Sequence, residues 1–319
     1  MEIVGLTVWI INRLAVTVGL GLILGFWLGI WYAPSYYDAS ECDGRRKWSW
    51  LQKAMAQNCI VTLLRNHYFN HTLVYTDTDG EVKPVSDAYY ARLSDNNETV
   101  IFAGHPHGLF AISSLLLVGL PSVRPSRIDS HLWKRTTESA DDDDNGKQKD
   151  TMAKPSSHWS NVRPCVHRHL FSIPLLRDLA LWLGAIDVSR ENITRTLKTH
   201  SVYLSPGGCR EMIIDGDSTA QRRHTGFLRL AYAERKLVYP VLHHGQARAF
   251  RSYSCAWLDR VRHIVLDLTG YPFPSFFLGP FPTTLTTHIL APHDPAAYET
   301  EDAFVNGYLA VLQRNVVVK

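Results

Sequence analysis

Hydrophobic and polar residues are distributed unevenly along the chain, and the first long apolar run stands apart from the rest. From Leu14 to Ala33, twenty residues pass without a charge. A helix of that length, rising about 1.5 Å per residue, crosses the ~30 Å hydrocarbon layer of a membrane. The run ends in tryptophan and tyrosine, which favour the membrane interface. We therefore expect a retained membrane helix rather than a cleaved signal peptide.

Beyond this anchor, short apolar runs alternate with helix-like stretches, which is typical of an α/β fold with helices packed on the faces of a sheet. Four predicted strands, each followed by polar or glycine-rich residues, span 99–104, 184–188, 202–205 and 237–242. Ligands of open α/β sheets bind beyond the carboxyl ends of the strands. We therefore expect an anchor over 1–40 and one domain over 41–319, with its site along one edge of the sheet.

One long polar stretch interrupts this alternation, between Pro121 and Ser160. It includes "ESADDDDNGKQKD", an acidic block followed by lysines, with almost nothing apolar to bury. Such a segment cannot offset the entropy cost of folding. We expect a disordered surface insertion over about 136–155; an acidic docking loop is the alternative.

Charge and cysteine usage indicate where the domain works. Arg45, Arg46 and Lys47 after the apolar run outweigh Arg13 before it, so the positive-inside rule puts the domain in the cytosol. The net charge of +3 is too balanced to indicate nucleic-acid binding, and no nucleic-acid partner is expected. The five cysteines are scattered without a CxxC pair, which fits a reducing compartment. Two topologies fit the apolar run: it crosses the membrane once, or it folds back as a hairpin.

Three glycines in the apolar run, Gly21, Gly25 and Gly29, recur every four residues on one helical face. This spacing lets two membrane helices approach closely and predicts a homodimer formed through the anchor. The alternative is that glycines are simply common in membrane helices, and the pattern alone does not choose between the two.

The stretch "AGHPHGLF" places two imidazoles, His105 and His107, where the first predicted strand ends. Pro106 keeps His105 extended, and Gly108 permits a tight turn before a helix that we expect to follow directly. An imidazole near a helix N-terminus can take the proton of an attacking hydroxyl while backbone N–H groups hold the developing oxyanion. We predict His107 as this base and expect His105 to shape the turn or to bond the acceptor.

A metal site is the main alternative for these histidines. His-x-His at one strand end, with His243 and His244 at another, could supply zinc ligands for a hydrolase. Such a site usually needs a further carboxylate, and Asp187 is a poor candidate. We expect no bound metal. A non-catalytic membrane-binding module is a third interpretation.

The stretch "SPGGCREM" follows the third predicted strand. Pro206, Gly207 and Gly208 form a turn whose bare backbone can approach a substrate. Glu211 could orient the catalytic imidazole, as the acid of a catalytic triad does; a solvated surface glutamate is the alternative. Nothing local lowers the pKa of Cys209, so we assign it no chemical role.

Two basic residues predict a binding position for phosphate groups. Arg222 and Arg223 directly precede a helix that begins near Gly226, where the phosphates of a substrate would meet both side-chain charge and the helix dipole. A solvated basic turn is the alternative. Near the C-terminus, the aromatic and proline-rich run "YPFPSFFLGPFP" could line an apolar channel, rest on a membrane or pack in the core.

Four motifs occur in one order: "GHPHG", "LGAIDVSRENI", "SPGGCREM" and "RRHTGFLRLAYAERKLVYPVLHHGQ". In these the chain resembles the diacylglycerol acyltransferase type 2 family, which also includes monoacylglycerol and wax-ester acyltransferases. The resemblance implies a glycerolipid-acyltransferase-like mixed sheet. It also implies transfer of a fatty acyl group from acyl-CoA to a lipid acceptor alcohol, with diacylglycerol giving triacylglycerol. No cofactor is implied beyond acyl-CoA as co-substrate, and the location implied is the endoplasmic reticulum membrane, with lipid droplets a second location.

The resemblance also implies roles for single residues. It makes His105 and His107 the signature pair, Glu211 the acid of PGGxxE, and Arg190 the basic residue after the second strand. Related enzymes use His-x4-Asp, whereas Phe110 stands five positions after His105, so the acid must come from elsewhere. The fourth strand ends in "HHGQ", where relatives have "FGQ" or "FGE".

Overall fold

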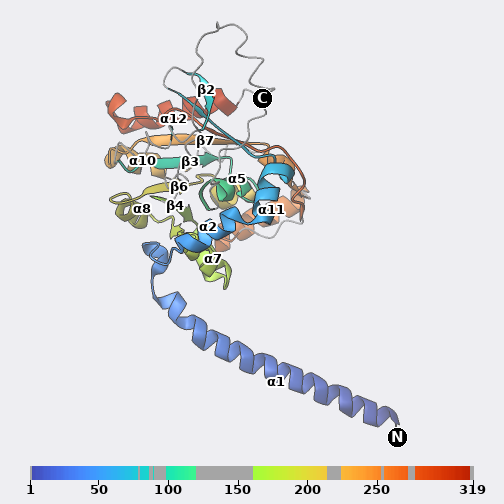
Figure 1. Cartoon of the computed structure of the whole chain (residues 1–319). Coiled ribbons are helices and arrows are strands. Elements are labelled where there is room, and N and C mark those ends of the chain that lie inside the picture. The colour runs from blue at the N-terminus through green and yellow to red at the C-terminus, as the bar shows by residue number, and fades with distance from the viewer. Residues whose placement is uncertain are drawn as a thin grey trace, which may run out of the picture.

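The computed structural model describes residues 2–77, 80–85, 89, 98–119, 161–213, 224–252, 255–271 and 277–316. A body built around one large sheet carries a long N-terminal helix that projects away from it (Figure 1). The predicted insertion over 136–155, the residues Arg222 and Arg223, and most of the "YPFPSFF" run lie outside the described residues.

The large sheet has eight strands in the order β2-β1-β10-β7-β3-β6-β4-β5. Their bounds are β1 Thr72–Thr76, β2 Val82–Pro84, β3 Ile101–His105, β4 Val162–Val166, β5 Ile186–Asp187, β6 Ser201–Leu204, β7 Val238–His244 and β10 Thr286–Ile289. The neighbours from β7 through β3, β6 and β4 to β5 are parallel, and β10 runs antiparallel to β7. The predicted α/β class with a mixed sheet is confirmed.

All four predicted strands are present, as β3, β5, β6 and β7. Because these strands are parallel, their carboxyl ends share one edge, as predicted. Every residue of β3 and β6 is buried, which explains why these strands read as continuous apolar runs instead of alternating ones. The register sets His105 of β3 beside Leu242 of β7 at that edge.

The helices of the body cover both faces of the sheet. They are α2 Ser49–Gln57, α3 Cys59–Leu63, α5 Ile112–Ser114, α7 Leu176–Trp182, α8 Arg190–Thr196, α9 Gly208–Ile213, α10 Gly226–Ala233, α11 Ala256–Thr269 and α12 Glu301–Val316. A π-turn, Leu115–Gly119, continues α5. A two-stranded sheet pairs β8, Arg251–Ser252, with β9, Phe277–Leu278.

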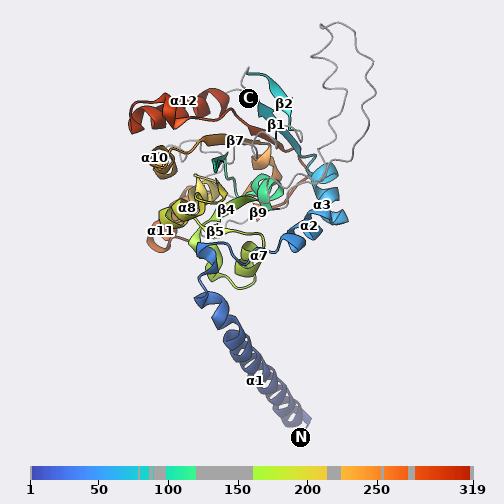
Figure 2. The same cartoon turned by 60° about the vertical axis from the view of Figure 1, so that its left-hand side comes forward.

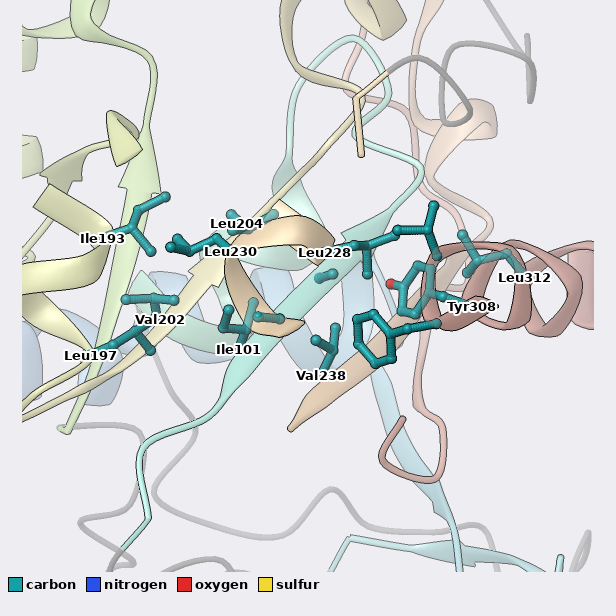
Figure 3. Close-up of a cluster of buried hydrophobic side chains, with 14 of the residues drawn as sticks. Ile101, Ile193, Leu197, Val202, Leu204, Leu228, Leu230, Val238, Tyr308 and Leu312 are labelled. Atoms are coloured by element: carbon teal, nitrogen blue, oxygen red, sulfur yellow. The ribbon is translucent and has the colours of Figure 1, made fainter. Parts of the chain in front are cut away.

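One main core cluster lies between the sheet and helices α8, α10 and α12 (Figure 3). Ile101 of β3 packs there with Leu228 of α10 and Tyr308 of α12. The next residue along β3, Phe102, belongs to the cluster on the opposite face, with Val118 of the π-turn. This alternation along a strand is the two-residue period of β-structure, and it gives the sheet an apolar layer on each side.

The N-terminal helix α1 spans Glu2–Tyr37, and its apolar part projects from the body (Figure 1, Figure 2). Within the described residues, one helix is long and apolar enough to cross a membrane; the qualifying span is Arg13–Cys42, with a mean hydropathy of 2.0. The division of the chain at residue 40 and the homodimer formed through the glycines of α1 stay predictions.

The end of α1 is held on the body by specific contacts. The Tyr36 hydroxyl donates to the Ser172 carbonyl at 3.0 Å. The carbonyl of Ser35 accepts from Nε of Arg177 at 2.9 Å, and this arginine, only 1% exposed, also pairs with Glu41 at 2.8 Å. A buried guanidinium satisfied in this way fixes the point where the chain leaves α1.

Candidate active site

The turn after β3 holds the two predicted histidines. His105 is the last residue of β3, and α5 begins at Ile112. The prediction that a helix follows directly after Gly108 is wrong. Gly108 adopts a φ of +65°, and the Ile112 N–H donates to the Phe110 carbonyl at 2.8 Å, so a tight loop separates His107 from the helix.

The His107 side chain is half-buried, and its hydrogen bond determines its tautomer. Nδ1 lies 2.8 Å from the Gly108 carbonyl oxygen. Because a carbonyl only accepts, Nδ1 carries the proton, and Nε2 keeps its lone pair. Burial lowers the pKa of His107, while the bond to Gly108 opposes this shift. The imidazole is therefore neutral at neutral pH and has the electronic form of a general base.

Glu211, on α9, lies against this turn but not in the predicted way. We expected its carboxylate to orient the imidazole. Instead, Oε2 of Glu211 accepts from the backbone N–H of His107, and the Nδ1 partner is the Gly108 carbonyl. The glutamate is 5% exposed, which excludes the solvated alternative. Through these contacts, Glu211 positions the main chain that carries the base.

The glycine pair at the start of α9 has a steric explanation. A Cβ on Gly207 would lie 1.8 Å from the carboxyl carbon of Glu211, so any side chain there would displace the carboxylate. Gly208 has a φ of +50°, in the left-handed region. The turn formed by Pro206, Gly207 and Gly208 therefore makes room for Glu211; its predicted contact with substrate stays a prediction.

Gln246, directly after "HHG", is the positioning residue that the sequence analysis missed. Its Nε2 donates to the carbonyls of Pro106 and His107, the former at 3.3 Å. Its Oε1 accepts from the Ser113 N–H at 3.1 Å. One buried amide thus ties the histidine turn to the start of α5. A Cβ on Gly108 would lie 2.8 Å from the Gln246 nitrogen, so this glycine also makes room for the clamp.

His105 lies beneath the turn, only 1% exposed. Its Nε2 is 3.1 Å from the Tyr308 hydroxyl of α12. Burial lowers the pKa of His105 from the ordinary 6.5 to about 3, so the ring is neutral. This placement supports the expectation that His105 shapes the turn.

A chain of buried polar groups runs under the same turn. The hydroxyl of Thr287 lies 2.9 Å from Nε2 of His71 and 3.1 Å from Nδ1 of His243. Nε2 of His243 lies 2.7 Å from the Tyr203 hydroxyl, which in turn lies 2.7 Å from the Ser114 hydroxyl. Each of these groups has a hydrogen-bond partner, so burying this polar network costs little free energy. The network joins β10, β7, β6 and α5.

This buried polar network predicts that any side chain added at Gly104 destabilises the protein. A Cβ there would lie 1.9 Å from the Tyr203 hydroxyl and 3.0 Å from Nε2 of His243. We expect Gly104→Ala to lower the free energy of unfolding by about 1–3 kcal/mol, as overpacking does. Thermal unfolding in detergent measures this loss. Gly226→Ala is the matched control, because no atom lies within 4 Å of its added Cβ; an equal loss in both variants would contradict the steric explanation.

The buried histidines predict acid sensitivity. Burial lowers the pKa of His71 to about 4 and that of His243 to about 3, from 6.5. These rings gain protons mainly on unfolding, so stability should be constant above pH 6.5 and should fall as the pH drops toward 4, by up to about 1.4 kcal/mol per pH unit for each ring. The unfolding midpoint against pH measures this.

Two histidine variants, one at a buried and one at an exposed position, test the acid sensitivity. His71→Gln should flatten the dependence of the unfolding midpoint on pH, because one proton uptake is removed. His67→Gln, at an exposed histidine, should leave the dependence unchanged. A midpoint that stays constant below pH 6.5 in the parent chain would contradict the prediction.

The hydrolase alternative finds little geometric support. His243 and His244 are consecutive in β7, so their side chains point to opposite faces, and His244 is exposed. Both ring nitrogens of His243 already contact protein hydroxyls. Among the described ranges, no group of three or more His, Cys, Asp and Glu could hold a metal ion.

The remaining predicted residues are placed as follows. Arg190 begins α8 just after β5, is exposed, and lies at the same edge of the sheet. Burial raises the pKa of the Cys209 thiol, which agrees with the absence of a chemical role. The substrate-binding roles of Arg190, Arg222 and Arg223 stay predictions.

One family of known proteins matches part of the chain. Residues 156–280 match the sequence model of the family described as diacylglycerol acyltransferase. Over this segment the chain is similar to the diacylglycerol acyltransferase family. The acyltransferase segment holds β4, β5, β6 and β7, together with Arg190, Glu211 and Gln246, whereas the His105–Gly108 turn precedes it. The resemblance noted from the motifs is confirmed.

The chain is also similar to "Diacylglycerol O-acyltransferase 1" of Saccharomyces cerevisiae, with 35% identity over 115 residues. The aligned part covers 34% of this chain and 28% of the yeast protein. No solved structure matches the chain.

Proposed function

We propose that the chain is a membrane-anchored enzyme that transfers a fatty acyl group from acyl-CoA to the free hydroxyl of diacylglycerol, giving triacylglycerol and CoA. The family match and the similarity to the yeast acyltransferase support the reaction class. The observation that carries the proposal is His107, which keeps a proton on Nδ1 and a lone pair on Nε2 at the carboxyl edge of the sheet.

The proposed reaction uses this lone pair directly. Nε2 of His107 takes the proton of the acceptor hydroxyl as its oxygen attacks the thioester carbonyl. The C–S bond then breaks, and the imidazolium returns the proton to the CoA thiolate. Acyl ester and CoA are formed without an acyl-enzyme intermediate. Glu211 and Gln246 hold the main chain of the base in place throughout, since both contact the backbone of His107.

We also propose which residues bind the substrates and in which membrane the protein lies. Arg190, Arg222 and Arg223 would bind the phosphates of CoA, and the turn from Pro206 to Gly208 would lie against the acyl-CoA. The fold would be of the glycerolipid-acyltransferase kind. The apolar length of α1 supports anchoring, proposed here in the endoplasmic reticulum membrane with the body facing the cytosol.

Microsomes carrying the chain test the proposal, when incubated with radiolabelled acyl-CoA and one acceptor at a time. The acceptors are diacylglycerol, monoacylglycerol, a long-chain alcohol and phytol. We expect labelled triacylglycerol that depends on added diacylglycerol, persists with a metal chelator present and is absent with His107→Ala. Release of free fatty acid without an acylated acceptor, abolished by chelator, would instead establish the hydrolase.

A further inference from the structure

Helix α11 exposes several of its apolar side chains and buries the charged Arg262 beside Leu266. Arg262 is 1% exposed, with Nη1 3.0 Å from the carboxylate of Asp259. On the other side, Trp257 is 68% exposed and Leu268 80%. A helix in contact with water normally shows the reverse arrangement. So many exposed apolar side chains on one helix indicate that its outer side has an apolar contact.

The exposed apolar residues of α11 form one continuous stripe. Its members, spaced by four, three and four positions, are Trp257, Val261, Ile264 and Leu268. At 3.6 residues per turn, this spacing places them along one line of the helix. Contiguous apolar surface of this kind marks a binding surface for a membrane or a protein.

Contacts at the end of α11 join this stripe to the membrane anchor. Tyr271, just beyond the helix, has its hydroxyl 2.8 Å from that of Ser172. The carbonyl of Ser172 is the group that accepts from Tyr36 of α1. In both views α11 lies in the half of the body from which α1 leaves (Figure 1, Figure 2). The Leu268 end of the stripe therefore lies near the helix proposed to enter the bilayer.

A further exposed apolar side chain, Leu175, lies beside the end of α1. Leu175 is 77% exposed, and its φ of +67° is in the left-handed region that leucine avoids. Its N–H donates at 2.9 Å to the Tyr32 hydroxyl of α1. A strained turn thus presents a leucine directly beside the anchor.

We infer that α11 lies on the surface of the membrane that α1 enters, with the stripe from Trp257 to Leu268 and the Leu175 side chain in contact with lipid. The inference rests on the membrane anchoring proposed above. An interfacial helix buries its apolar side at the boundary between headgroups and acyl chains. The contacts with α1 favour lipid as the occupant over a protein partner, because they hold the stripe next to the bilayer.

This placement has a consequence for the active site. Helix α11 packs against α9, which carries Glu211. Glu211 bonds the main chain of His107. Two packed helices, α11 and α9, therefore lie between the proposed membrane surface and the turn that carries the proposed base.

Lipid-borne quenching tests the inference on the full chain. The exposed cysteines Cys59 and Cys255 are replaced by serine, and a fluorescent NBD label is attached to one new cysteine at a time. The test position is Leu268→Cys. Leu24→Cys reports the anchor, and Glu234→Cys, exposed at the end of α10, is the matched control. Each protein is reconstituted in phosphatidylcholine vesicles with and without doxyl-labelled phosphatidylcholine.

We expect the Leu268 label to lose most of its fluorescence to the doxyl lipid and to emit at shorter wavelength, as the Leu24 label does, while the Glu234 label changes little. A quenched Leu24 label with an unquenched Leu268 label would overturn the inference and leave the anchor standing. An unquenched Leu24 label would overturn the anchor, whatever Leu268 shows. Quenching at Leu268 that disappears when the three residues Trp257, Ile264 and Val261 are changed to glutamine would assign the contact to the stripe.

Discussion

His107→Ala is expected to lower kcat for triacylglycerol formation by about 10²- to 10⁴-fold, the usual contribution of a positioned general base. The physical reason is the Nε2 lone pair, which the bond from Nδ1 to the Gly108 carbonyl keeps available. KM for acyl-CoA should change little. Initial rates with labelled acyl-CoA in microsomes, normalised to protein level, measure both parameters.

His105→Ala is the control for this first prediction. That ring is buried against Tyr308, so its loss should lower stability more than it lowers kcat. A larger kcat defect at His105 than at His107 would mean that the other imidazole is the base. The pH profile adds a separate check: because burial lowers the pKa of His107, the rate should begin to fall only below the ordinary value of 6.5.

Glu211 should affect the rate only by positioning His107, without an independent role in catalysis. Glu211→Gln keeps an oxygen that can accept from the His107 N–H, so we expect a milder defect than in Glu211→Ala. Combining His107→Ala with Glu211→Ala should cost little more than His107→Ala alone, since residues that act as a unit are not additive. A double defect equal to the product of the single ones would show that the two residues act independently.

Gln246→Glu is expected to lower kcat by about 10²-fold, because a base misplaced by about 1 Å loses rate on that scale. The substitution preserves shape but removes both N–H donors and sets a negative charge against the carbonyls of Pro106 and His107. Gln246→Ala should lower kcat less, since it removes the clamp without adding repulsion. Rates and unfolding midpoints measured together distinguish displacement of the turn from loss of the fold.

Gln313→Glu provides the matched control for the Gln246 prediction. It makes the same chemical change at an exposed position of α12, and it should leave rate and stability unchanged. Full activity in Gln246→Glu would show that the histidine turn keeps its shape without the clamp. Gln246 would then be a residue of the core and not a positioning residue.

Local sequence alone predicted the strands and the edge where they converge. Strands β3, β5, β6 and β7 are short apolar runs bounded by turn residues, and strands buried on both faces need such runs wherever they lie in the fold. The histidine pair and Glu211 were found because each follows a strand that ends at the same edge. A signal for Gln246 was also present, since it ends the fourth of these strand turns.

Tertiary structure alone decided which atoms pair. Gln246 reaches Ser113 across 133 positions of the chain, and His105 reaches Tyr308 across 203. A local pattern carries no information about such partners, because they depend on strand order and helix packing. The same holds for α11. Its sequence contains an apolar stripe, which in a water-soluble domain would face the core, and only the structure shows that Arg262 and Leu266 are buried while the stripe is exposed.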